Sequence, residues 1–214
     1  MPDAPPPDST PRPVPTPSTT LRGARFYAGF LTPEAQQDLV AELRGLVAQA
    51  PLFSPVTRSG QMSVRMTSAG RFGWVADARG YRYSTTHPSG QPWPAIPDSV
   101  LAIWRAVSGA SREPGCCLIN FYGEGARMGL HQDRDEADFT QPVVSISLGD
   151  DALFRIGNPT RGGRTQSLWL RSGDVLVLGE AARLCYHGVD RIAPGTSTLL
   201  AQGGRINLTL RVVD

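Results

Sequence analysis

The segment Arg205-Ile206-Asn207-Leu208-Thr209-Leu210-Arg211 alternates polar and apolar residues along its whole length. Because the side chains of a β-strand point alternately to its two faces, this segment predicts a strand with one polar and one apolar face. The polar face carries Arg205, Asn207, Thr209 and Arg211, and the apolar face carries Ile206, Leu208, Leu210 and Val212. Two guanidiniums and an amide inside a protein are costly unless an anion lies beside them. We therefore expect a small dicarboxylate at the polar face.

Short strands separated by turn residues fill the chain from Cys116 onward. Their density predicts a double-sheet jelly roll, or double-stranded β-helix. Several of them carry polar residues on one face, where an ordinary sandwich core is apolar, so we expect a barrel lined for a polar occupant. The eight expected strands span residues 116–122, 129–133, 143–149, 152–157, 165–170, 174–179, 182–189 and 205–212, and the polar pairs are Asn120 and Tyr122, His131 and Asp133, and Ser145 and Ser147.

Two supporting helices are expected before this barrel, which makes the chain mostly β in an α+β arrangement. The first spans residues 32–50, where Thr32 can cap, Pro33 suits the first helical position and apolar residues recur at helical spacing. The second follows Pro97 and is amphipathic. Its expected inward side chains are Val100, Leu101, Trp104 and Val107.

The organisation along the chain divides into three segments. Residues 1–20 are rich in Pro, Ser and Thr and predict a disordered tail. Residues 21–115 hold the two helices and, between them, a stretch rich in Gly, Arg and aromatic residues (53–94) that predicts short strands and loops. Residues 116–214 form the expected jelly-roll core.

Composition limits the class of protein. A chain of 214 residues with 40% hydrophobic content can bury a core of one main domain. The sequence shows neither an apolar run of about 20 residues nor a secretory signal, so we expect a cytoplasmic protein without a membrane span. Three cysteines, two of them adjacent, predict no disulfide framework and no cysteine-bound zinc. A net charge of +2 does not by itself indicate nucleic-acid binding, and nothing in the sequence demands more than a monomer.

The motif His131-Gln132-Asp133, together with the distant His187, predicts a metal centre. Two imidazoles and one carboxylate can occupy one face of an iron(II) ion and leave three positions open for a co-substrate and dioxygen. A His-x-Asp motif alone is weak evidence, but eight expected strands and the polar strand at 205–211 strengthen it. Zinc or manganese remain alternatives, because these ligands do not select iron by affinity alone.

The sequence resembles the AlkB family of Fe(II)/2-oxoglutarate-dependent nucleic-acid demethylases from Leu21 to Val212. The resemblance is carried by Asn120-x-Tyr122, His131-x-Asp133-x-Asp135, His187 and Arg205-x-Asn207-x-Thr209-x-Arg211, with Met66, Trp74 and Tyr81 where relatives have a nucleotide-recognition lid. It implies that His131, Asp133 and His187 bind iron. It also implies that Asn120, Tyr122, Arg205, Asn207 and Arg211 bind 2-oxoglutarate. The two arginines would serve different ends of the co-substrate, or one would instead brace a metal ligand.

The resemblance implies oxidative demethylation of DNA, single-stranded or damaged double-stranded, with RNA as a further partner. N1-methyladenine and N3-methylcytosine are the expected substrates, and formaldehyde, succinate and CO2 the expected products. Both lesions are cationic and cannot pair normally, which lowers the cost of flipping the base out of a duplex. The cofactors implied are Fe(II), 2-oxoglutarate as co-substrate, and O2.

A flipped cationic base needs an aromatic face and a nearby carboxylate. Trp74 would supply the face, worth about 0.5–2 kcal/mol as a cation–π contact, with the ring of His131 on the other side. Asp135 would supply the carboxylate. The full set expected at the nucleic acid is Met66, Trp74, Tyr81, Arg82, Tyr83, Asp135 and Arg161, with Arg164 as a further phosphate contact. The alternatives are an ordinary core role for Trp74 and plain surface roles for the charged residues.

One position departs from the family pattern. Relatives often carry Trp near position 178, where this chain has Leu178, which leaves access of oxygen to the site open. Two other functions remain possible at this point. One is a 2-oxoglutarate oxygenase acting on a protein or a small molecule, and the other is a non-catalytic barrel that binds nucleic acid.

Overall fold

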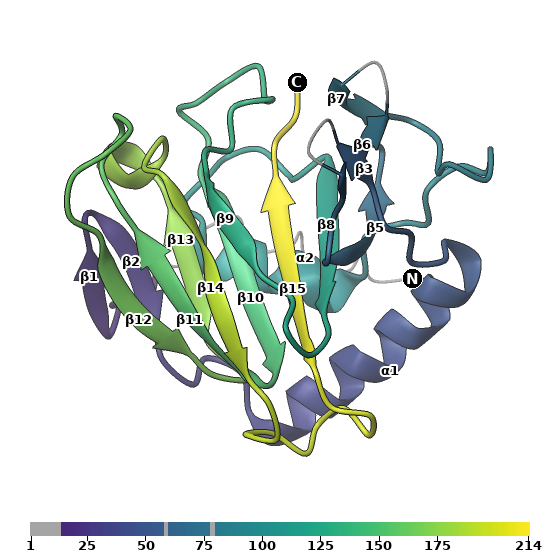
Figure 1. Cartoon of the computed structure of the whole chain (residues 1–214), viewed down its shortest axis with the longest axis horizontal. Helices are drawn as coiled ribbons and strands as arrows, with labels where there is room; N and C mark the ends of the chain where they lie inside the picture. The colour runs from purple at the N-terminus through teal and green to yellow at the C-terminus, as the bar shows by residue number, and fades with distance from the viewer. Residues whose placement is uncertain (1–13, 58–59, 78–79) are drawn as a thin grey trace, which may run out of the picture.

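The computed structural model describes residues 14–57, 60–77 and 80–214. Two antiparallel sheets face each other and form the barrel (Figure 1). In order across the sheet, the seven-stranded one contains β1 (Thr19–Leu21), β2 (Ala24–Tyr27), β13 (Val175–Leu178), β10 (Val143–Gly149), β15 (Arg205–Arg211), β8 (Cys116–Tyr122) and β5 (Arg65–Gly70). The four-stranded one contains β12 (Gln166–Leu170), β11 (Asp151–Ile156), β14 (His187–Ala193) and β9 (Met128–His131).

The expected jelly roll is confirmed, because the eight predicted strands divide equally between the two sheets. Several boundaries shift by one residue, and three shift by more: the end of β9 and both ends of β14, which runs to Ala193 and not to 189. Strand β9 ends at His131 and not at 133, so Asp133 lies beyond the sheet. Strand β14 begins at His187 and not at 182, because the chain first makes a 3-10 turn, Glu180–Ala182, in which Glu180 has a φ of 47°.

Both predicted helices are confirmed. Helix α1 spans Pro33–Gln49, and the Thr32 side chain accepts a hydrogen bond from the Ala35 amide at its start. Helix α2 spans Asp98–Val107. Its buried residues are Val100, Ile103, Trp104 and Val107, whereas the predicted Leu101 is only half-buried. Ile103 takes the inward place because positions 100, 103, 104 and 107 share one helical face.

The alternation predicted for β15 decides how the layers are arranged. Leu208 and Leu210 belong to a core cluster that also contains residues of both helices, so the helices cover the outer face of the larger sheet. The opposite face turns Arg205, Thr209 and Arg211 into the barrel, where all three are buried. One strand therefore supplies both the core behind the sheet and the polar lining in front of it.

The N-terminal segment is built into the barrel rather than standing beside it. Strands β1, β2 and β5 extend the larger sheet, so the expected boundary at 115/116 runs through a single sheet. Most of the predicted tail, residues 1–13, lies outside the described residues, and its last residues, Thr19 and Thr20, already belong to β1. No helix in the described part of the chain has the length and apolar character needed to cross a bilayer.

Two small hairpins complete the fold. One pairs β3 (Val56–Thr57) with β4 (Gly60–Gln61), and the other pairs β6 (Gly73–Asp77) with β7 (Gly80–Ser84). Figure 1 shows the β6–β7 hairpin at the end of the barrel where β15 finishes. Arg211 is the last residue of β15, and the hairpin residues Trp74 and Tyr81 line the same cavity as Arg211 and His187.

Candidate active site

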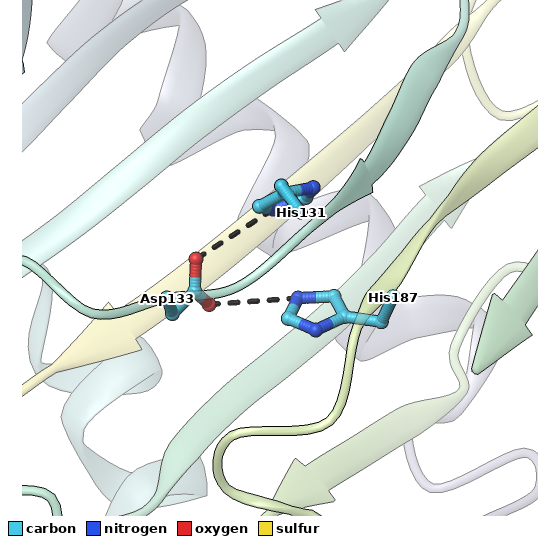
Figure 2. A group of neighbouring side chains, drawn as sticks. All are labelled: His131, Asp133 and His187. Carbon is cyan, nitrogen blue, oxygen red and sulfur yellow. Dashed lines mark ion pairs between the residues drawn. The ribbon is translucent and has the colours of Figure 1, made fainter. Parts of the chain in front are cut away.

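Two side chains of one short motif, His131 and Asp133, and the distant His187 meet at one point inside the barrel. Figure 2 shows the Asp133 carboxylate facing both imidazoles. His131 and His187 are directly opposed partners in the pairing of β9 with β14. Oδ1 of Asp133 lies 3.6 Å from Nε2 of His131, and Oδ2 lies 3.6 Å from Nε2 of His187. The three ligand atoms lie within 4.8 Å of one another, which suits binding of a single ion.

The backbone orients both imidazoles for metal binding. Nδ1 of His131 lies 3.0 Å from the Gly129 carbonyl oxygen, and Nδ1 of His187 lies 2.9 Å from that of Cys185. Because a carbonyl only accepts, each Nδ1 donates its proton and each Nε2 keeps its lone pair for a metal.

Asp133 is held ready as an anion. Its Oδ1 accepts a 2.8 Å hydrogen bond from Nη2 of Arg211, whereas Oδ2 is buried and has no hydrogen-bond partner in the described part of the chain. Burial alone would raise the pKa of Asp133, but Arg211 and the two imidazoles hold this pKa well below its usual value. A carboxylate that faces one imidazole lone pair with each oxygen, and that has one oxygen unpartnered, fits a divalent cation.

Arg205 is buried completely but has only neutral partners among the described residues. Its guanidinium donates to the backbone oxygens of Asp150 and Leu170 and, at 2.6 Å, to the Ser147 hydroxyl, and its Nε has no partner. Burial lowers the pKa of Arg205 to about 10, so the group is still cationic at neutral pH. Asp174 and Asp151 act on this guanidinium only from a distance, and a buried cation whose described hydrogen-bond acceptors are all neutral fits an anionic ligand.

The three candidate metal ligands, which we call the His-Asp-His triad, and Arg205 line one cavity of about 800 Å³. Within it, Oδ1 of Asn120 has no hydrogen-bond partner in the described structure, and burial raises the pKa of Tyr122 to about 12, so its hydroxyl stays protonated. Asn207 is less available, because its amide donates to Ser145 and to the backbone, and its oxygen accepts from Thr209. Predicted co-substrate residues that line the cavity are Asn120, Tyr122, Arg205, Asn207 and Arg211.

The β6–β7 hairpin contributes an aromatic pair at the cavity. Trp74 stacks on Tyr81 with ring centroids 5.2 Å apart, and its Nε1 donates a 3.0 Å hydrogen bond to Asp135. Trp74, Tyr81 and Asp135 all line the cavity, as do the buried Met66 and the exposed Arg161, whose guanidinium lies over the Tyr186 ring. The expected aromatic face and carboxylate are thus neighbours.

Two expected substrate residues lie elsewhere. Arg82 and Tyr83 are half-buried and do not line the cavity. The Tyr83 hydroxyl, expected at a phosphate, instead donates to Oε1 of Glu136 at 2.5 Å. Burial raises the pKa of Tyr83, because the ionised form would lose its solvation.

Comparison with known proteins identifies the family. A model of the 2OG-Fe(II) oxygenase superfamily matches residues 23–211. The alpha-ketoglutarate-dependent dioxygenase AlkB homolog of Caulobacter vibrioides (strain NA1000 / CB15N) is 52% identical over 91% of this chain and 90% of its own. The chain belongs to the AlkB family of 2OG-Fe(II) oxygenases. An Arabidopsis thaliana member, named DNA N(6)-methyladenine demethylase ALKBH1D, is 35% identical over 88% of this chain and 49% of its own. The structure of OsALKBH1 is 30% identical, with a TM-score of 0.78 over 90% of this chain and 99% of its own.

As a 2OG-Fe(II) oxygenase, the protein is an enzyme that uses Fe(II), 2-oxoglutarate and O2. The residues present fit these cofactors. The three ligand atoms of His131, Asp133 and His187 can hold one ion, and the buried guanidinium of Arg205, whose Nε has no described partner, can bind a carboxylate. Leu178, the position at which we expected a departure from the family pattern, is 2% exposed and lines the same cavity.

Sequence reasoning missed three residues that hold the site together. Gln132 donates to the backbone oxygens of Pro159 and Leu184, while Glu136 and Arg183 form a buried ion pair of 3.0 Å. Glu136 lies three residues after the candidate metal ligand Asp133, in the run Asp133-Arg134-Asp135-Glu136. This short spacing could have indicated that Glu136 lies near the site. Arg183 lies about 50 residues further on, and no local pattern marks it.

Proposed function

We propose that the enzyme repairs alkylated DNA, and RNA as a second substrate, by oxidative demethylation of N1-methyladenine and N3-methylcytosine. The observation that carries this proposal is that Trp74 stacks on Tyr81 and donates to Asp135. All three residues line the same cavity as the His-Asp-His triad. An aromatic face and a carboxylate together suit a flat cationic base. The name of the Arabidopsis relative, a DNA demethylase, supports a nucleic acid as the partner.

The roles of the chain's own residues follow from their positions. His131, Asp133 and His187 would hold Fe(II), and Arg205 would anchor the distal carboxylate of 2-oxoglutarate, with Asn120 and Tyr122 on the same cavity wall. With its cofactors bound, the site supplies oxidation: 2-oxoglutarate and O2 yield succinate and CO2, and the second oxygen atom enters an N-methyl C–H bond. The resulting hydroxymethyl group leaves as formaldehyde and restores the base.

Trp74, Tyr81 and Asp135 would hold the base, and Met66 would close the floor of the base site. In the base-free protein Asp135 accepts the Trp74 indole hydrogen, so an incoming base amino group would compete for the same carboxylate. Arg161 and Arg82 would contact the phosphate backbone. We do not extend this role to Tyr83, because its hydroxyl already contacts Glu136.

The test is mass spectrometry of short oligonucleotides after incubation with Fe(II), 2-oxoglutarate and O2. DNA and RNA strands carrying N1-methyladenine, N3-methylcytosine or N6-methyladenine should be compared. We expect loss of 14 mass units per repaired N1-methyladenine or N3-methylcytosine, as the methyl carbon leaves as formaldehyde, and no change with His187→Ala. If the parent and His187→Ala give the same spectra on every strand, the proposed function is wrong.

A 2-oxoglutarate oxygenase acting on a protein or a small molecule would behave differently. It would form succinate without repairing any oligonucleotide, and Trp74→Ala would not alter its turnover selectively. We further propose that the enzyme acts as a monomer in the cytoplasm, which sedimentation and cell fractionation would test.

A further inference from the structure

A buried cluster of charged side chains connects the β6–β7 hairpin to the metal ligand Asp133. It consists of Tyr83, Glu136, Arg183 and Arg211 around Asp133. The side chain of Glu136 is 1% exposed, that of Arg183 3% and that of Arg211 7%. Buried charges of this kind are stable only when each one has its partners, so the cluster has few alternative arrangements.

Glu136 lies at the centre of this cluster. Its Oε1 accepts the Tyr83 hydroxyl hydrogen and lies 3.5 Å from Nε of Arg211, and its Oε2 accepts from Arg183 at 3.0 Å. Two carboxylates, Asp133 and Glu136, balance two guanidiniums, so the cluster is neutral. Removing the charge of Glu136 would leave Arg211 with Asp133 as its main anionic partner.

The two arginines carry the connection from Glu136 to the metal ligand. Arg211 donates to Oδ1 of Asp133 at 2.8 Å, and Arg183 donates to the Asp133 backbone oxygen at 2.6 Å. Arg183 also donates to the Gln141 backbone oxygen. Both the side chain and the backbone of the metal ligand are therefore positioned by groups that contact Glu136.

The hairpin meets this segment at two adjacent points. Trp74 and Tyr83 are directly opposed partners in the pairing of β6 with β7. Trp74 donates to Asp135 and Tyr83 to Glu136, which follow each other in the chain. A shift of the hairpin would therefore pull on the residues immediately after Asp133.

We propose that Glu136 is a positioning residue that couples the placement of the β6–β7 hairpin to metal binding at Asp133. The coupling itself needs only the metal site, and its benefit to base recognition rests on the function proposed above. Because such coupling is reciprocal, metal binding should reduce the motion of the β6–β7 hairpin. Without the Tyr83 hydroxyl, metal binding should no longer change the motion of the hairpin.

The experiment uses Co(II) with 2-oxoglutarate and no nucleic acid, so that it does not depend on demethylation. Co(II) affinity is measured by visible absorption, and amide hydrogen exchange is measured for β6 and β7 with and without these ligands. Parent protein, Glu136→Gln and Tyr83→Phe are compared. Tyr27→Phe is the matched control, because Tyr27 is a buried tyrosine of the core behind the larger sheet.

We expect ligand binding to slow hairpin exchange several-fold in the parent and in Tyr27→Phe, and not in Tyr83→Phe. Glu136→Gln should weaken Co(II) binding about tenfold, within the range seen for residues that support metal ligands. A hairpin that responds to Co(II) in Tyr83→Phe as it does in the parent overturns the proposal. Co(II) affinity at the parental value in Glu136→Gln, or no response in the parent, overturns it as well. If Glu136→Gln fails to fold, Tyr83→Phe, which removes the hydroxyl that contacts both Glu136 and Arg211, decides the coupling.

Discussion

The two arginines of β15 have the same side-chain chemistry, lie on the same face of one strand and are both buried, yet their surroundings differ. Arg211 contacts the carboxylates of Asp133 and Glu136, at 2.8 and 3.5 Å. Arg205, six residues earlier, has only neutral acceptors in the described structure. Arg211 therefore has carboxylate partners within the protein, whereas Arg205 keeps an unpartnered Nε and is the arginine of the two that can take up an external anion.

This difference divides the work of the cavity. Burial lowers the pKa of Arg205, whereas at Arg211 the carboxylates of Asp133 and Glu136 outweigh burial and raise the pKa. The Arg211 end stabilises the metal ligand before any ligand binds. The Arg205 end can bind the co-substrate. Until it does, the desolvation of Arg205 lowers the stability of the folded protein.

The largest expected effect is on stability at the Arg211 end. Arg211→Met removes a buried ion-pair partner of Asp133 and leaves the cluster with an excess negative charge. We expect the free energy of unfolding without ligands to fall by about 3–5 kcal/mol, measured by urea denaturation. A loss below 1 kcal/mol would show that the two arginines are equivalent after all.

The second effect is on ligand binding at Arg205, where we expect a large loss of 2-oxoglutarate affinity and a small change in stability. Arg205→Met should weaken 2-oxoglutarate binding by about 2–5 kcal/mol, because a buried charge-assisted contact is lost. The ligand-free protein should change by no more than about 1–2 kcal/mol, since removing a poorly neutralised charge offsets three lost hydrogen bonds. Calorimetry with 2-oxoglutarate and Mn(II), beside urea denaturation, measures both. Unchanged 2-oxoglutarate affinity would contradict the comparison.

A third, smaller effect concerns binding of the methylated base and should leave the 2-oxoglutarate site at Arg205 unchanged. Trp74→Ala should weaken binding of an N1-methyladenine oligonucleotide by about 0.5–2 kcal/mol through the lost cation–π contact. The KM for 2-oxoglutarate should stay at the parental value. Trp169→Ala is a matched control, because Trp169 is exposed and does not line the cavity. Equal losses in both variants would assign no base contact to Trp74.

The smallest expected signal is a pH dependence. The pKa of Asp133 in the folded protein lies well below its ordinary value of 3.8, so the contribution of this carboxylate to stability is complete above pH 3.8 and is lost as the pH falls below it. Arg211→Met should reduce the acid sensitivity of the free energy of unfolding in this window. Arg205→Met should retain it. Urea midpoints between pH 5 and the onset of acid unfolding provide the measurement.

Much of the fold could be predicted because it depends on local patterns. The helix beginning at Thr32 and the alternation of Arg205–Arg211 both follow from the geometry of one element. The end of β9 at His131 could not be predicted, since Gln132 leaves the sheet to contact the backbone at Pro159 and Leu184. Pairing partners of this kind are set by residues far away in the chain.

The candidate site divides in the same way. The amino-acid sequence by itself determined which ligands were available, His131, Asp133 and His187, and which face of β15 is polar. Only the tertiary structure decided that Arg211 neutralises Asp133 while Arg205 does not, and that Tyr83 contacts Glu136. The physical reason is that charge chemistry belongs to the residue, whereas the partner of a buried charge depends on strand register and on which distant segment, here that of Arg183, packs beside it.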